Sequence, residues 1–132
     1  MTLLHFQPIQ GKALDIIEAI LKAEEVVPVA DGWSLLSVVV EEIVLNIVDY
    51  SHSDYIDVEI IRDEESITLR FHDSGVAYNP LERESPDFSI PMEDRKIGGL
   101  GIFMVIQYMD DVAYEHTAGE NIFTVRKYLK NL

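Results

Sequence analysis

The sequence has 132 residues, 48% of them hydrophobic, and a net charge of −14. This length predicts a single domain, residues 1–132, with one hydrophobic core. The acidity argues against nucleic acid as a partner, and the absence of cysteine excludes disulfides and thiolate metal sites. No apolar run reaches the ~20 residues that span a bilayer, so we expect a cytoplasmic protein with no membrane segment.

The predicted elements begin with a strand at residues 2–7. Apolar residues at helical spacing then predict a helix from Ala13 to Ala23. Pro28 and the pair Asp31-Gly32 predict a break in the chain. A second, strongly apolar helix is predicted from Ser34 to Tyr50.

Alternation of apolar and polar residues predicts strands at residues 56–61 and 67–72, joined by a turn at residues 63–65. After a long polar segment, helical spacing returns at residues 102–109. Strands are predicted at residues 112–116 and 122–129, with a turn at Gly119. These elements predict an α/β (α+β) fold: a two-layer sandwich of a mixed, mostly antiparallel sheet with about three helices on one face.

A polar ridge runs along the second predicted helix. Glu42, Asn46 and Tyr50 lie four residues apart, on one side of a helix that is otherwise apolar. The ridge is either a narrow solvent face or the wall of a cleft. A carboxylate and a carboxamide one turn apart suit an octahedral Mg²⁺ ion, and a glutamate that does not bind the metal suits a general base.

A second group of polar residues ends the second of the two central strands, from Asp73 to Pro80. Asp73 has the strand parity of the apolar residues before it, so its side chain should point toward the core. A buried carboxylate needs a donor, and the amino group of adenine is one such donor. Gly75 leaves room for a flat base, although an ordinary turn explains the same residues equally well.

A third pattern, Gly98-Gly99-Leu100-Gly101, precedes the predicted helix at residues 102–109. Glycines at the start of a helix expose backbone N–H groups to a phosphate, and the helix dipole favours the anion. The P-loop does not apply, because its lysine is absent from this pattern.

Together, the double glutamate and asparagine of residues 41–46, the segment 73–80, the glycines of 98–103 and the closing segment 119–129 resemble the GHKL ATPases. Within them, the sequence is most similar to the bacterial anti-sigma-factor serine/threonine kinases. The resemblance implies that the cofactors are ATP and Mg²⁺, that Glu42 is the catalytic base and that Asn46 is the metal ligand. It also implies an ATP-binding set of Asn46, Asp49, Tyr50, Asp73, Gly75, Lys96, Gly98, Gly99, Leu100, Gly101 and Thr124.

The resemblance further implies that residues 81–97 form a lid over the phosphates. The expected partners are an anti-anti-sigma protein of the STAS type, which would be phosphorylated, and a sigma factor, which would be sequestered. A homodimer is left open. The alternative is a non-catalytic nucleotide-binding module that acts through protein contacts alone.

Overall fold

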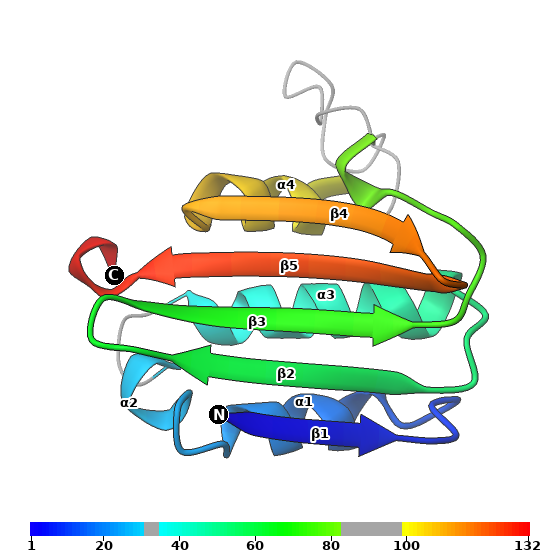
Figure 1. Cartoon of the computed structure of the whole chain (residues 1–132), viewed down its shortest axis with the longest axis horizontal. Helices are drawn as coiled ribbons and strands as arrows, with labels where there is room; N and C mark the ends of the chain where they lie inside the picture. Colours follow the sequence, from blue (N-terminus) through cyan, green and yellow to red (C-terminus); the bar gives the residue numbers. More distant parts are fainter. Residues whose placement is uncertain (31–34, 83–98) are drawn as a thin grey trace.

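Figure 1 shows a computed structural model of the chain, in which residues 1–30, 35–82 and 99–132 are described. The strands are β1 (Thr2–Phe6), β2 (Ile56–Arg62), β3 (Ser66–Asp73), β4 (Asp111–Thr117) and β5 (Glu120–Tyr128). The helices are α1 (Ala13–Leu21), α2 (Val27–Ala30), α3 (Leu36–Tyr50) and α4 (Gly99–Tyr108), with short 3-10 turns η1 (Pro80–Glu82) and η3 (Leu129–Asn131). The strands form one sheet in the order β1-β2-β3-β5-β4.

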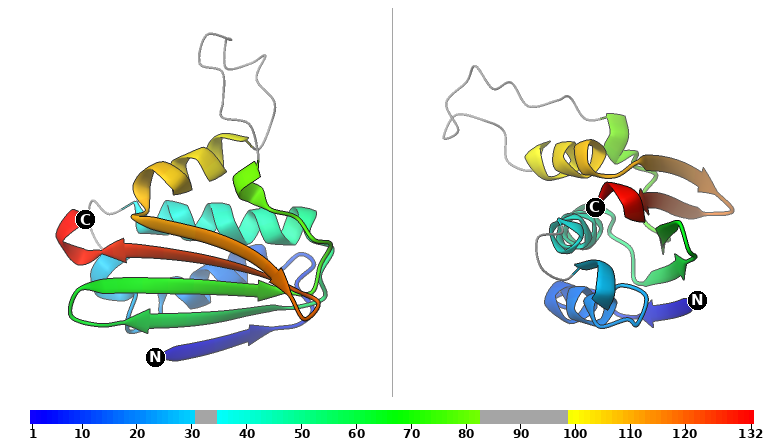
Figure 2. Two further views of the ribbon diagram at one scale, coloured as in Figure 1. Left: turned by 45° about the horizontal axis from the view of Figure 1, so that its top comes forward. Right: turned by 90° about the vertical axis from the view of Figure 1, so that its left-hand side faces the viewer.

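The sheet and the helices form two layers (Figure 2), as the sequence predicts. Helices α1, α3 and α4 lie over one face of the sheet, and the other face is not covered by a helix of the described residues. Each neighbouring pair of described strands is antiparallel, so that part of the sheet contains no parallel pair. The antiparallel pairing brings the end of β3 beside the start of β5, where Asp73 and Asn121 line the same hollow as Asn46 of α3.

The core lies between α3 and the inner face of the central strands. Alternate residues of β2 and β3 are almost fully buried, and the same parity carries on to Asp73. Helix α3 buries Leu36, Val39, Val40, Ile43, Val44, Ile47 and Val48. Burying an aliphatic side chain stabilises a fold by about 1.5–3 kcal/mol, so this helix is held firmly and gives the site a rigid wall.

Two local predictions differ from the structure. Pro28 does not simply break the chain: it lies in the first turn of α2, where a proline costs little because no N–H is needed there. Helix α4 begins at Gly99 rather than at residue 102, so Gly99, Leu100 and Gly101 are already helical. The first N–H groups of a helix have no partner within the helix, so the earlier start still leaves donors without a helical acceptor at this end.

Candidate functional site

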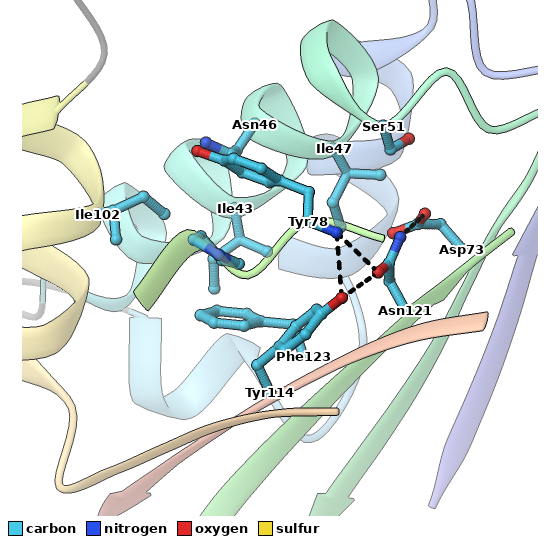
Figure 3. A pocket seen from close by; sticks show the side chains of 11 residues that line it. Ile43, Asn46, Ile47, Ser51, Asp73, Tyr78, Ile102, Tyr114, Asn121 and Phe123 are labelled. Carbon is cyan, nitrogen blue, oxygen red and sulfur yellow. Dashed lines mark hydrogen bonds between the residues drawn. The ribbon is translucent and has the colours of Figure 1, made fainter. Parts of the chain in front are cut away.

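A hollow opens between α3, α4, the end of β3 and strands β4 and β5 (Figure 3). Its walls combine apolar side chains with a few polar ones. The lining residues are Ile43, Asn46, Ile47, Ser51, Asp73, Tyr78, Pro80, Ile102, Tyr114, Asn121 and Phe123. The lining residues come from segments that are far apart in the sequence, so the hollow forms only when the chain folds.

Asp73 is the buried charge of the hollow, and only 4% of it is exposed. Its Oδ1 accepts hydrogen bonds from the backbone N–H of Gly75 at 2.9 Å and from Nδ2 of Asn121 at 3.0 Å. None of the described residues donates to Oδ2. Burial raises the pKa of Asp73, against the lowering effect of the Asn121 hydrogen bond. Within the described part of the chain, Oδ2 of Asp73 therefore has no donor, and a ligand could supply one.

The residue of β5 that contacts Asp73 is Asn121. The geometry does not support the prediction that Thr124 belongs to the ATP-binding set. Asn121 is paired directly with Asp73 across the ladder, whereas Thr124 is paired with Arg70. Side chains alternate along a strand, and both neighbours of Thr124, Phe123 and Val125, are buried on the helix-covered face. Thr124 thus faces away from the hollow. The pairing of β5 with β3, which the sequence alone does not show, is what identifies Asn121.

Gly75 is required by the chain itself rather than by a base lying on it. A Cβ added there would lie 2.0 Å from the backbone oxygen of Ser51. That oxygen also accepts a hydrogen bond from the N–H of Val76 at 2.9 Å. The close approach ties the segment after β3 to the end of α3. Ser51 lines the hollow and Gly75 does not, so Gly75 shapes the site from behind.

The polar ridge of α3 serves two hollows. Asn46 lines the hollow that contains Asp73. Glu42, one turn earlier, lines a second hollow between α3 and α4, together with Leu35, Val38, Val39, Gly101, Met104, Val105 and Tyr108. Because the ridge borders hollows rather than open solvent at these two positions, the cleft interpretation of the ridge is the better one.

Glu42 lies directly against the glycine cluster. A Cβ added to Gly101 would lie 2.0 Å from Oε2 of Glu42, so a side chain at this position would displace the carboxylate. Burial raises the pKa of Glu42, and the charge of Glu41 raises it further. A carboxylate with a raised pKa is a stronger base, and this is the property that a general base needs.

The remaining predicted residues lie at the edge of the site or outside the described ranges. Asp49 and Tyr50 are exposed at the end of α3 and do not line the hollow. Gly99 and Leu100 form the first turn of α4. Lys96 and Gly98 lie outside the described residues, and so does the predicted lid apart from its first two residues, which belong to η1.

Among residues 1–30, 35–82 and 99–132, no three His, Cys, Asp or Glu side chains are grouped so that they could hold a metal ion. No helix within the same ranges is long and apolar enough to cross a membrane.

A hollow with apolar walls and one buried acceptor carboxylate is the kind of site that takes a flat ring bearing an amino donor. The family model of the histidine kinase-like ATPase domain matches residues 10–127. The chain is also similar to a serine/threonine-protein kinase, BtrW, from Bordetella bronchiseptica. The two are 25% identical over 113 residues, which cover 79% of this chain and 80% of the relative.

The chain therefore belongs to the histidine kinase-like ATPase domain family, as its motifs predict. Membership in an ATPase family implies that the domain binds ATP. The hollow around Asp73 contains the residue that the motifs predict as the acceptor of the adenine amino group.

Proposed function

We propose that the protein is an ATP-dependent serine/threonine kinase and anti-sigma regulatory factor of the cytoplasm. Its acceptor would be a serine or threonine of an anti-anti-sigma protein of the STAS type, and it would sequester a sigma factor. The observation that carries the nucleotide part is the buried carboxyl of Asp73, which has no donor for Oδ2 among the described residues. The kinase part is supported by Glu42, with its raised pKa, and by the similarity to BtrW.

Four groups of residues would bind the nucleotide and act on the acceptor. Asp73 accepts a hydrogen bond from the adenine amino group. Asn46 is the protein ligand of Mg²⁺, which would neutralise charge on the phosphates. The N–H groups of residues 98–101, with Lys96, bind the phosphates. Glu42 takes the proton of the acceptor hydroxyl, and the oxygen of that hydroxyl forms a bond to the terminal phosphorus of ATP. The bond from this phosphorus to the bridging oxygen breaks, and ADP leaves.

The direct test is incubation with labelled ATP and the anti-anti-sigma protein encoded nearest to this chain's gene. We expect transfer of the label to one serine or threonine of that protein, identified by mass spectrometry. Binding of the acceptor with no transfer of label would contradict the kinase proposal. It would favour the alternative, a non-catalytic module that holds nucleotide and switches partners.

Asn46→Ala should weaken the binding of ATP·Mg²⁺ and leave the binding of adenosine nearly unchanged. The carboxamide is proposed to contact the ion, and adenosine carries no phosphate to which an ion could bind. Loss of one ligand and its hydrogen bonds should cost about 10-fold in affinity for ATP·Mg²⁺. Calorimetric titration with each compound checks this. An equal loss for both would show that Asn46 only shapes the adenine hollow.

Gly101→Ala should reduce phosphoryl transfer while ATP affinity changes little. The new Cβ would push the Glu42 carboxylate out of place, and misplacement of a catalytic group by about 1 Å costs up to roughly 100-fold in rate. The clash is with the end of a flexible side chain, so the fold should persist. The rate of phosphoryl transfer and the Kd for ATP are both measured for the variant and for the parent protein. A variant that transfers phosphate at the parent rate would argue against Glu42 as the base.

A further inference from the structure

Asn121 is the centre of a buried network that holds the segment after β3. Its Nδ2 donates to Oδ1 of Asp73 at 3.0 Å and to the backbone oxygen of Val76 at 2.9 Å. Its Oδ1 accepts from the backbone N–H of Tyr78 at 3.3 Å and from the hydroxyl of Tyr114. With 5% of its surface exposed, Asn121 has nearly its whole hydrogen-bonding capacity committed within the protein.

Tyr114 contacts the Oδ1 side of the Asn121 amide. Its hydroxyl donates to Oδ1 of Asn121 and accepts from the N–H of Tyr78 at 3.1 Å (Figure 3). A flipped amide would bring two donors together at Tyr78 and two acceptors together at Asp73, so the network permits one orientation. The amide therefore always presents a donor to Asp73.

This arrangement determines what Asp73 offers to a ligand. Oδ1 is held by two protein donors, and Oδ2 receives no hydrogen bond from the described residues. The donor from Asn121 also favours the ionised form of the carboxyl, which can only accept hydrogen bonds. Such a group suits a purine with an amino group at position 6 and rejects a purine with a carbonyl oxygen there.

We propose that Asn121 and Tyr114 are positioning residues that set the discrimination between 6-amino and 6-oxo purines by locking Asp73 as an acceptor. This inference rests on the proposed function, because it requires that ATP binds at Asp73. Neither residue has to contact the base. Each acts through Asp73: Asn121 directly and Tyr114 through Asn121.

The test compares the Kd values of ATP and inosine triphosphate, which carries a carbonyl oxygen at position 6, by calorimetry. Tyr114→Phe keeps the ring that lines the hollow and removes only the hydroxyl. We expect the ratio of the two affinities to fall by about 5-fold. Asn121→Asp is nearly isosteric and replaces the donor with an acidic group, so the ratio should fall by roughly 10-fold or more. In that variant the ratio should fall further as the pH is lowered, because a protonated carboxyl can donate to the carbonyl oxygen.

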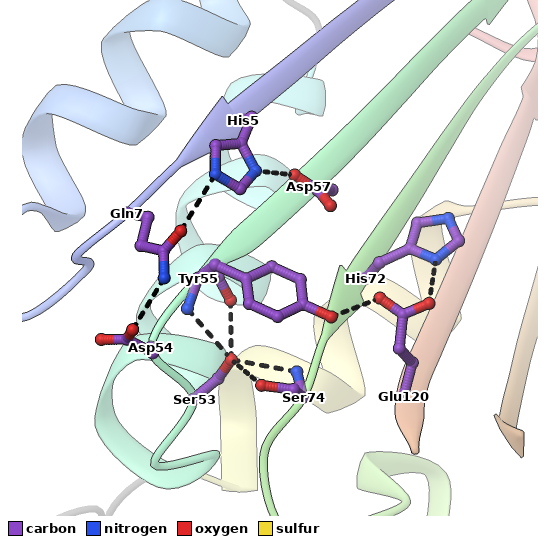
Figure 4. A network of polar contacts seen from close by, with 9 residues as sticks. All are labelled: His5, Gln7, Ser53, Asp54, Tyr55, Asp57, His72, Ser74 and Glu120. Carbon is purple, nitrogen blue, oxygen red and sulfur yellow. Dashed lines mark hydrogen bonds and ion pairs between the residues drawn. The ribbon is translucent and has the colours of Figure 1, made fainter. Parts of the chain in front are cut away.

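The matched control is Tyr55→Phe on the opposite face of the sheet. The Tyr55 hydroxyl donates to Oε2 of Glu120 at 2.6 Å, beside Asn121 in the sequence but in a separate network (Figure 4). This variant should keep the parent ratio. If Tyr114→Phe and Asn121→Asp weaken both nucleotides in equal proportion, their role is structural and the inference is overturned. If the parent protein binds ATP and inosine triphosphate equally well, the inference fails but the proposed function stands. If the parent protein binds neither nucleotide, the proposed function fails as well.

Discussion

Asp73→Asn should lose ATP binding by roughly 100-fold or more while the protein stays folded. A hydrogen bond to a charged group contributes about 1.5–3 kcal/mol. The new amide can turn its oxygen toward Asn121 and the N–H of Gly75, which are both donors, so its NH₂ group then meets the amino group of adenine. Two donors in a buried site repel each other and leave both unpaired. Calorimetric titration with ATP measures the loss.

The stability of the same variant separates loss of the site from loss of the fold. The pKa of Asp73 is raised in the folded protein, so the ionised carboxyl disfavours folding. That cost is absent at low pH, grows as the pH rises above the unfolded pKa and is complete above the folded pKa. Without ligand, Asp73→Asn should therefore unfold at the parent temperature or higher at neutral pH. A variant that binds ATP as tightly as the parent would show that adenine binds elsewhere.

Glu42→Gln should lose phosphoryl transfer by about 10²–10⁴-fold, the usual contribution of a positioned base. The loss is expected at the lower end, because kinase transition states are loose and little proton removal occurs early. The amide has nearly the same shape, and Glu42 does not line the hollow that contains Asp73, so the Kd for ATP should stay close to that of the parent. Single-turnover transfer to the acceptor protein, beside the Kd for ATP, checks both statements.

The pH dependence of transfer gives a second test of Glu42. Only the ionised carboxylate accepts a proton, so the rate should fall as the pH falls through the raised pKa of Glu42. This fall in rate, the acid limb of the pH profile, should occur at a higher pH than it would for a glutamate with an ordinary pKa. Glu41→Gln is the matched control, because it removes the neighbouring charge that raises this pKa. It should keep transfer and shift the limb to lower pH; transfer that is lost equally in both variants would contradict a special role for Glu42.

Much of the site could be predicted from periodicity alone. The alternation before Asp73 correctly predicts that its carboxylate is buried, since side chains on one strand face share their environment. The four-residue spacing on α3 correctly predicts that Glu42 and Asn46 share one ridge. Both predictions are local: they need only the repeat of one element and the apolar residues around it.

The parts that could not be predicted depend on how elements pack against one another. Thr124 lies in a segment, Ile122 to Val125, whose apolar residues do not mark one face clearly, so only the pairing with β3 shows that Asn121 meets Asp73. The close contact of Gly101 with Glu42 depends on where α4 crosses α3. Glycine patterns predict exposed N–H groups, but they do not predict which side chain occupies the space that a missing Cβ leaves.

A map of backbone amide NMR shifts on addition of ATP·Mg²⁺ tests most directly whether ATP binds at Asp73. If ATP binds at Asp73, saturable changes should be concentrated around the hollow, in residues 43–51, 73–80, 99–102 and 121–123. Amides of β1 and β2, which do not line the hollow, should change least. Changes concentrated on those two strands, or no saturable change in residues 73–80, would contradict the claim that ATP binds at Asp73.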